Sequence, residues 1–135
     1  MPAKDRLHDN VVHALEKADW KIVREQFGIA LESRTIWIDL RAQKEQENLV
    51  ILVEVKDFDR TGSPVHYLAN ALGQYLLYRS ALILTDDPTP LYMALPISSY
   101  NRIMTEDIGQ DVIQRYELRL IVFDPFTEEI VQWIP

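Results

Sequence analysis

Two acidic residues and one lysine stand inside stretches that otherwise resemble the apolar strands of a protein core. Glu54 and Lys56 are two residues apart within Leu49–Phe58, which is rich in Val and Ile, so on a strand their side chains leave the same face. Asp39 lies in Arg34–Arg41, where apolar and polar residues alternate as in a half-buried strand. An unpaired charge in the middle of such a strand costs several kcal/mol. The three side chains therefore need partners, either one another or a ligand.

The turn between these two stretches sets which residues face each other. Lys44–Asn48 is purely polar and predicts a turn, whose middle residues are Gln46 and Glu47. Antiparallel strands joined by a turn centred there bring Asp39 opposite Glu54, with their Cβ atoms roughly 5 Å apart. Two carboxylates that close repel unless one is protonated or a cation lies between them. A hard divalent ion with oxygen ligands, Mg²⁺ or Mn²⁺, meets that need.

This arrangement has the groups that phosphodiester hydrolysis requires. Asp39 and Glu54 would bind the metal ion, with the Val55 carbonyl as a further ligand, and Lys56 would hold water or the phosphate. We therefore predict Asp39, Glu54 and Lys56 as catalytic residues. A cluster of ion pairs that only closes the sheet explains the same pattern equally well.

A second set of polar residues follows on a predicted helix. Ser63 as N-cap and Pro64 in the first turn begin a helix over Pro64–Arg79, which is apolar over most of its circumference and is therefore expected to be buried. One of its faces carries Tyr67, Ala71, Gln74 and Tyr78. We predict that Gln74 and Tyr78 contact substrate. The alternative is that Tyr78 is a core aromatic residue and that Gln74 bonds a loop.

The remaining patterns predict one α/β (α+β) domain with a mixed central sheet flanked by helices. Within Arg34–Arg41 the alternation places Ile36, Ile38 and Leu40 on one face. The order is α-β-β-β-α-β-α-β-β and ends in a β-hairpin. The further elements are a helix over Lys4–Ala18, a strand over Trp20–Glu25, a turn in Phe27–Ser33, a strand over Leu91–Leu95, one or two helices in Ser98–Tyr116 with a break at Gly109, and strands Leu118–Asp124 and Glu128–Ile134 joined by Pro125–Thr127.

Composition limits the class of protein. The 135 residues suit a single domain over 1–135. No apolar run is long enough to span a membrane, cysteine is absent, and no leader is expected, so we predict a cytoplasmic protein without disulfides or thiol chemistry. The net charge of −7 argues against a coat that binds nucleic acid along its whole length. It leaves room for a nucleic-acid enzyme whose carboxylates hold metal.

The charged residues resemble the motifs of the PD-(D/E)xK nuclease superfamily. Asp39 matches the first acid, preceded by Ile38 in place of Pro, and Glu54-Val55-Lys56 matches the (D/E)xK element. Gln74 and Tyr78 match the QxxxY motif of the branch with RecB-type nucleases and Holliday-junction resolvases. The resemblance implies a restriction-endonuclease-like fold with an α-β-β-β-α-β core.

Superfamily members often place a further acid on the first helix, and Asp5, Asp9 and Glu16 all lie on its polar side. A solvated helix face is the favoured explanation for them. The other polar candidates are expected to lie at the surface or in loops. They are His8 and His13, which are about 140° apart around the helix and form no metal pair, His66, Asp57 and Asp59.

Five stretches spread over nearly the whole chain carry a further resemblance. They are Met1–Asp5 with His8, Val53–Lys56, Ala71–Arg79, Leu118–Pro125 and Gln132–Pro135. Together they resemble the XisH family. The resemblance implies developmentally programmed excision of the fdxN element in cyanobacterial heterocysts, a companion protein, XisI, and a separate site-specific recombinase.

We therefore predict a DNA element excision factor that hydrolyses DNA with Mg²⁺ or Mn²⁺. Two alternatives stay open. The chain could be a non-catalytic regulator that binds XisI or the recombinase and keeps the nuclease fold as a platform. It could also be one subunit of a homo-oligomer that forms a DNA groove across two chains, with an interface on the apolar stretches Leu118–Phe123 and Ile130–Ile134.

Overall fold

The computed structural model describes residues 3–135 and the side chains from Arg6 onward. The first residues of the stretch Met1–Asp5, which contributes to the family resemblance, and the candidate carboxylate of Asp5 lie outside this description. The elements are α1 (Ala3–Lys17), β1 (Lys21–Ala30), β2 (Thr35–Lys44), a short 3₁₀ turn (Glu45–Glu47), β3 (Leu49–Val55), α2 (Pro64–Leu84), β4 (Leu91–Pro96), α3 (Ile97–Ser99), a π-helical turn (Tyr100–Met104), α4 (Asp107–Arg115), β5 (Leu120–Asp124) and β6 (Glu129–Ile134).

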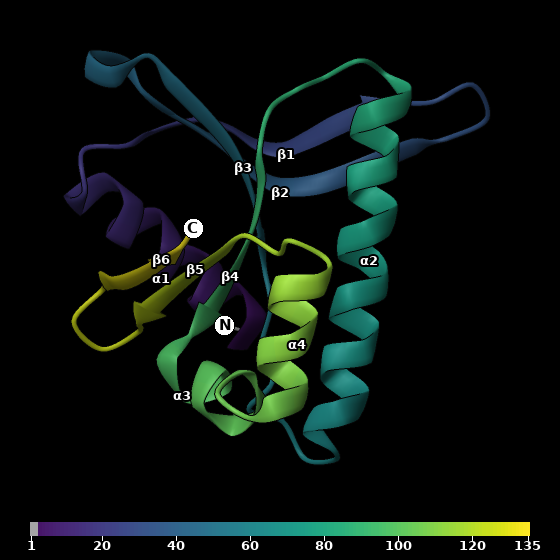
Figure 1. Cartoon of the computed structure of the whole chain (residues 1–135). Coiled ribbons are helices and arrows are strands. Elements are labelled where there is room, and N and C mark those ends of the chain that lie inside the picture. Colours follow the sequence, from purple (N-terminus) through teal and green to yellow (C-terminus); the bar gives the residue numbers. More distant parts are fainter. Residues whose placement is uncertain (1–2) are drawn as a thin grey trace.

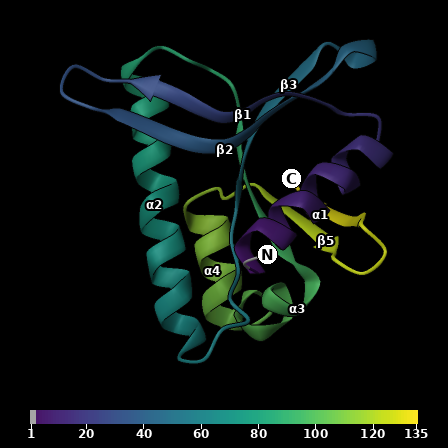
Figure 2. The same ribbon diagram turned by 180° about the vertical axis from the view of Figure 1, so that it is seen from behind.

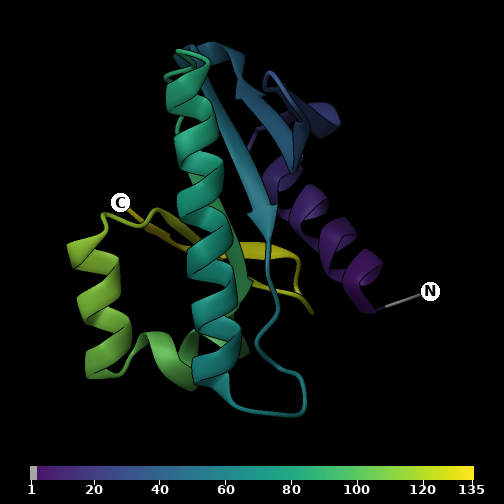
Figure 3. The same ribbon diagram turned by 90° about the vertical axis from the view of Figure 1, so that its right-hand side faces the viewer.

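The six strands form one mixed sheet in chain order. β1, β2 and β3 are antiparallel neighbours, β3, β4 and β5 are parallel, and β6 returns antiparallel to β5 as the predicted hairpin. The helices cover the sheet from both sides, with α1 on one face and α2 and α4 on the other (Figures 1 and 3). The predicted α+β class with a mixed central sheet is confirmed.

Each face of the sheet has its own core. The predicted stripe of α1 is buried through Val11 and Leu15, which pack with the sheet residues Val53 and Val55. The opposite face packs α2 and α4 against residues such as Leu52. Because side chains alternate along β3, Glu54 leaves the sheet on the same side as Leu52, toward α2.

The register predicted between β2 and β3 is also confirmed. The paired residues run from Lys44 opposite Leu49 to Leu40 opposite Val53. The next pair in this register is Asp39 and Glu54, as the polar turn indicated.

Asp39 lies where β2 changes face. Leu40 packs in the core under α1, but Ile38 packs in the core under α2, so the prediction that they share a face is wrong. The ladder with β3 ends at Leu40, and on the other side the pairing with β1 omits Asp39 and the opposing residue Gln26, whose φ is +56°. The strand therefore turns over at Asp39. Beyond it the β1–β2 hairpin crosses the C-terminal half of α2 (Figures 1 and 2).

Three predicted boundaries differ from the structure. The turn predicted in Phe27–Ser33 begins only after Ala30, because β1 continues through Gly28, where a Cβ would lie 2.8 Å from the Trp37 ring. β3 ends at Val55 rather than at Phe58, and α2 continues to Leu84 rather than ending at Arg79. Gly28 leaves room for the Trp37 ring of β2 to pack on β1. The glycine therefore lies within β1 and does not end it.

The expectation that α2 is buried is wrong for one of its faces. Leu77, Ile83 and Leu84 are 65%, 70% and 74% exposed. The face that carries Leu68, Ala71 and Tyr75 is the buried one. The helix lies on one side of the sheet with nothing beyond it, so an apolar circumference did not predict full burial.

The predicted break at Gly109 is wrong as well. α4 runs through this residue, and the helical region is interrupted earlier, at Thr105 and Glu106. Gly109 is needed for close packing, because an added Cβ would lie 2.3 Å from the Ile103 carbonyl oxygen and 2.4 Å from the Met104 Cα.

We expect Gly109→Ala to lower the free energy of unfolding by about 3 kcal/mol, because the clash is with backbone that cannot rotate away. Gly73→Ala is the matched control, since nothing lies within 4 Å of its added Cβ in the middle of α2. That variant should gain about 0.5–1 kcal/mol from helix propensity. Urea unfolding of both variants checks the pair, and equal stabilities would contradict the packing argument.

The oligomer interface predicted on Leu118–Phe123 is wrong for this stretch. Apart from Arg119, its side chains are fully buried inside the chain. β6 is more open, with Val131 51% and Trp133 37% exposed. In the part of the chain that the structure describes, no helix is long and apolar enough to cross a membrane.

Candidate active site

Asp39 and Glu54 meet where the β2–β3 ladder ends. The Asp39 N–H donates to Glu54 Oε1 at 3.0 Å, and the Val55 N–H donates to Asp39 Oδ2 at 2.8 Å. Each carboxylate thus accepts a hydrogen bond from the backbone of the opposite strand. Both residues are well shielded, with Asp39 9% exposed and the Glu54 side chain 13% exposed.

Lys56 joins the two carboxylates from the same face of β3. Its Nζ lies 3.6 Å from Glu54 Oε2, and it donates a hydrogen bond to Gln74 Oε1 on α2. The lysine is therefore fixed between a strand neighbour and a helix, and 20% of its side chain remains exposed. Three predicted site residues and the predicted helix residue Gln74 share one location.

The electrostatics of the site are dominated by the two acids. Burial, followed by the negative charge of Asp39, raises the pKa of Glu54 to about 7, although Lys56 acts in the opposite direction. The Tyr78 hydroxyl has a raised pKa because it is partly buried and because Glu54 and Asp39 place negative charge near it. Tyr78 is therefore near enough to both acids for their charge to act on its hydroxyl.

The donors at this point fit a hard divalent cation. Asp39 and Glu54 are the two carboxylates that meet here, and among residues 6–135 no group of three or more His, Asp or Glu side chains is placed to hold a metal ion. Mg²⁺ is typically bound by one or two carboxylates, with water and substrate phosphate filling its other positions. The pKa of Glu54 is raised chiefly by burial, and the smaller contribution from the negative charge of Asp39 is the one that a bound cation would offset. The two carboxylates therefore suit Mg²⁺ or Mn²⁺ and not a closed structural zinc site.

The described acids and histidines of α1 lie elsewhere. Asp9 and Glu16 are exposed, and their charges act on His13. The pKa of His13 is raised chiefly by its 2.6 Å hydrogen bond to Glu128. His8 forms a similar 2.5 Å contact with Glu25 in β1. These contacts fasten α1 to the sheet on the face opposite Glu54, so neither Asp9 nor Glu16 joins the site.

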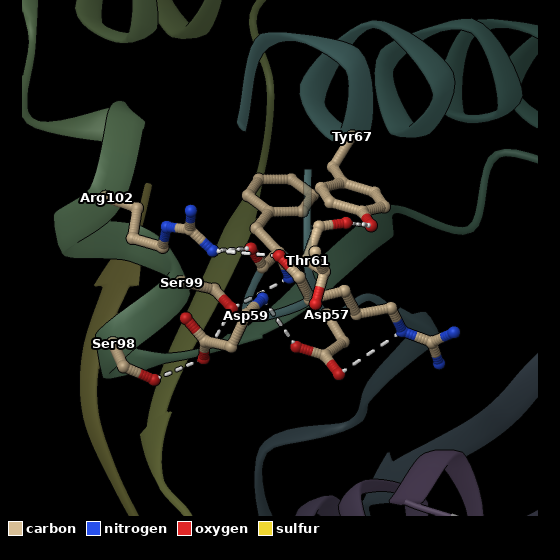
Figure 4. Close-up of polar contacts among 9 residues, drawn as sticks. Asp57, Asp59, Thr61, Tyr67, Ser98, Ser99 and Arg102 are labelled. Atoms are coloured by element: carbon tan, nitrogen blue, oxygen red, sulfur yellow. Dashed lines mark hydrogen bonds and ion pairs between the residues drawn. The ribbon is translucent and has the colours of Figure 1, made fainter. Parts of the chain in front are cut away.

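The loop that follows Lys56 is held in place by residues beyond β4 (Figure 4). The Ser99 hydroxyl accepts the Phe58 N–H at 2.9 Å and donates to Asp59 Oδ2 at 3.0 Å. Arg102 Nη1 donates to the Phe58 carbonyl at 2.6 Å and to the Arg60 carbonyl at 3.3 Å. These partners are about forty residues apart in the chain, and no local pattern in the sequence announces them.

Asp57 and Asp59 are loop residues, as predicted. Asp57 Oδ1 accepts the Asp59 N–H at 2.8 Å, and Asp57 Oδ2 lies 3.6 Å from Arg60 Nε. The far end of the loop is fixed by the Tyr67 hydroxyl, which donates to the Thr61 carbonyl at 2.6 Å. His66 is exposed and lies edge-on to Tyr67, with ring centroids 6.0 Å apart.

A cleft of about 310 Å³ opens between this loop and the first turns of the helices. It lies on the other side of Lys56 from the acids, because Tyr67 and Asn70 of α2 line it whereas Gln74 and Tyr78 stand further along the helix. The residues that line it are Leu7, Val55, Lys56, Asp57, Arg60, Tyr67 and Asn70. Sequence reasoning did not predict this cleft.

Comparison with known proteins gives a consistent result. The sequence model of the family described as "XisH protein" matches residues 1–131. The crystal structure of an fdxN element excision controlling factor protein from Anabaena variabilis is 30% identical, with a TM-score of 0.89 over 97% of this chain and 99% of that one. An XisH family protein from Nostoc punctiforme PCC 73102 is also 30% identical, with a TM-score of 0.88 over 97% of this chain and all of that one. No curated protein matches the chain.

Proposed function

This chain belongs to the XisH family, and from that premise we propose that it is a DNA element excision factor that hydrolyses phosphodiester bonds with Mg²⁺ or Mn²⁺. In this proposal the domain has a PD-(D/E)xK, restriction-endonuclease-like core. Asp39 and Glu54 bind the metal ion, Lys56 is the third catalytic residue, and Gln74 and Tyr78 contact substrate or orient the site.

One observation carries the proposal: among the residues that the structure describes, the site holds two shielded carboxylates and one fixed cation, Lys56. A cluster that served only to close the sheet would be expected to balance its charges, because an uncompensated buried charge is costly. Here Lys56 lies 3.6 Å from Glu54, yet Glu54 still has a pKa of about 7. When Glu54 is ionised, the two carboxylates carry more negative charge than Lys56 offsets, and this excess supports the proposal that the site receives a cation.

Different residues of the site would have different roles in hydrolysis. A water oxygen must lose a proton and bond to phosphorus while the bond from phosphorus to the leaving sugar oxygen breaks and that oxygen gains a proton. A divalent cation, when bound, supplies positive charge at the phosphate and activates water. Lys56 has three N–H donors, one of which Gln74 receives, so the ammonium can bind water or a phosphate oxygen. Tyr78, like any tyrosine, is protonated at neutral pH, and its raised pKa extends that range, so its hydroxyl can donate to the DNA backbone.

The test uses supercoiled plasmid DNA and purified protein. We expect nicked or linear DNA in Mg²⁺ or Mn²⁺ and none in a chelator, together with heat of Mn²⁺ binding in calorimetry. If the protein neither cleaves the plasmid nor binds Mn²⁺, the proposal is contradicted. The alternative, a platform that regulates a recombinase, is then favoured. The control for trace contaminants is the Glu54→Gln variant purified in parallel.

The proposal also extends to partners. The excision role in the name of the Anabaena variabilis protein, applied to this chain, implies that the DNA contains an excised element. A companion XisI-like protein and a separate recombinase complete the system in this proposal. A pull-down of the purified proteins, with and without DNA, tests these contacts directly.

A further inference from the structure

Lys56 borders two neighbouring features, the candidate active site and the cleft. Along α2, the residues Tyr78 and Gln74 face the acids and the lysine, and Asn70 and Tyr67 then line the cleft. A DNA strand bound at the two acids can therefore continue past Lys56 into the cleft. The cleft volume of about 310 Å³ is at the lower end of small-ligand sites, which limits it to a unit of modest size.

The cleft has an available basic side chain. Arg60 is 53% exposed, and its Nε lies 3.6 Å from Asp57 Oδ2. Asp57 also accepts the Asp59 N–H, so its negative charge is shared between two donors. No described residue accepts a hydrogen bond from the two terminal nitrogens of the guanidinium, and such a group binds phosphate in two-point fashion.

The cleft also has an aromatic wall that is held still. The Tyr67 hydroxyl is tied to the Thr61 carbonyl at 2.6 Å, which orients the ring that lines the cleft. Bases stack on aromatic side chains in single-strand binding sites, and this contact tolerates any sequence. Asn70, one turn along α2, adds an exposed amide.

The loop that carries Arg60 is ordered before any ligand binds. Arg102 donates to the carbonyls of Phe58 and Arg60, and Ser99 accepts the Phe58 N–H (Figure 4). A loop fixed in this way loses little entropy when it binds a ligand. The buried Ser99, together with Arg102 on the π-helical turn, thus positions the loop that forms one wall of the cleft.

We propose that the cleft is a subsite for one nucleotide of the DNA strand beside the bond that is cut, with Arg60 on its phosphate and Tyr67 against its base. This inference rests on the proposed function and names the part of the substrate that lies beyond Lys56.

The test measures binding and cleavage separately. Binding of a short fluorescein-labelled DNA is followed by anisotropy across a salt series, with Ca²⁺ in place of Mg²⁺. Arg60→Ala should weaken binding about tenfold and reduce the salt slope by about one, as expected for one lost phosphate contact. Tyr67→Leu should weaken binding about tenfold with an unchanged slope, because stacking carries no charge. Circular dichroism checks that both variants are folded.

Arg34→Ala is the matched control. Arg34 is an exposed arginine in the β1–β2 turn. This turn lies toward the C-terminal end of α2 (Figures 1 and 2), whereas Tyr67 and Asn70, which line the cleft, lie in the N-terminal part of that helix. This variant removes the same charge, and it should bind DNA nearly as the wild type does. Equal losses in the Arg34 and Arg60 variants would mean general attraction to DNA and would overturn the subsite.

The outcomes separate the subsite from the nuclease. If Arg60→Ala binds DNA normally while Glu54→Gln abolishes cleavage, the subsite is wrong and the proposed function stands. If Arg60→Ala weakens binding but the wild type never cleaves, the subsite stands and the nuclease is wrong. At saturating protein, an Arg60→Ala variant that cuts at the wild-type rate supports a binding role.

Discussion

Glu54→Gln is expected to abolish DNA cleavage and, in metal-free solution above pH 7, to make the folded protein more stable. The loss of a metal-binding carboxylate should lower the cleavage rate by about a thousandfold or more. The gain in stability arises because a neutral amide removes the charge that burial and Asp39 disfavour. Lower activity together with higher stability is the pattern expected of a residue kept for function at the expense of the fold.

The pH dependence follows from the raised pKa of Glu54. Between pH 4.5, the usual pKa of a glutamate, and about pH 7, the pKa of Glu54 in the folded protein, the folded protein holds a proton that the unfolded chain has released. Stability therefore falls as pH rises through this window and levels off above pH 7. The difference between the two pKa values corresponds to roughly 3 kcal/mol. Glu54→Gln should match the wild type near pH 4 and exceed it by that amount at pH 8.

Urea unfolding at pH 4 and pH 8 in a chelator, combined with the plasmid assay, measures both effects. Glu32→Gln is the control, since it makes the same change at an exposed site in the β1–β2 turn, and it should alter neither quantity. Cleavage that survives in Glu54→Gln would end the catalytic assignment. Parallel pH profiles for this variant and the wild type would contradict the account of Glu54 charge.

The part of the site that could be predicted depends on regular geometry. Residues two apart on a strand share a face, and this rule alone predicted that Glu54 and Lys56 lie on the same side of the sheet. The polar turn fixed the register and brought Asp39 opposite Glu54, since the pairing of Lys44 with Leu49 leads directly to them. Helical spacing likewise placed Gln74 and Tyr78 on the face that meets the strand.

The part that could not be predicted depends on departures from regular geometry. Alternation gave no sign that β2 changes face at Asp39, because the opposing Gln26 adopts a left-handed conformation that its sequence does not require. The loop after Lys56 is held by Ser99 and Arg102, and such long-range contacts leave no local signal. Gly109 was misjudged because glycine serves close packing as well as chain breaks.

The change of face of β2 at Asp39 also explains how the end of the strand ladder forms the site. Where regular pairing stops, backbone groups lose their ladder partners and must find others. Here the Asp39 N–H is taken by the Glu54 carboxylate, and the Val55 N–H by the Asp39 carboxylate. The two acids thus satisfy the backbone at the end of the ladder, and the same bonds hold their carboxylates together.

Lys56→Met is expected to lower the cleavage rate by about a hundredfold or more, because the fixed ammonium no longer reaches water or phosphate. It should also lower the metal-free free energy of unfolding by about 2 kcal/mol at pH 8, since Lys56 lies 3.6 Å from Glu54 and lowers its pKa. Near pH 4, where Glu54 is protonated, the loss should be smaller. Met keeps the unbranched shape of lysine, so the comparison isolates the charge.

The double variant with Glu54→Gln decides whether Lys56 acts through Glu54. With a neutral residue at position 54, Lys56→Met should lose most of its pH-dependent cost, because the charge it opposed is gone. Lys56→Arg should restore the wild-type pH profile of stability without restoring full cleavage, since a guanidinium carries the charge in a different shape. An equal cost of Lys56→Met in both backgrounds would mean that the ammonium is held for Gln74 or for packing alone. Separately, cleavage by Lys56→Met at the wild-type rate would remove the lysine from the catalytic set, even if the two carboxylates keep their metal.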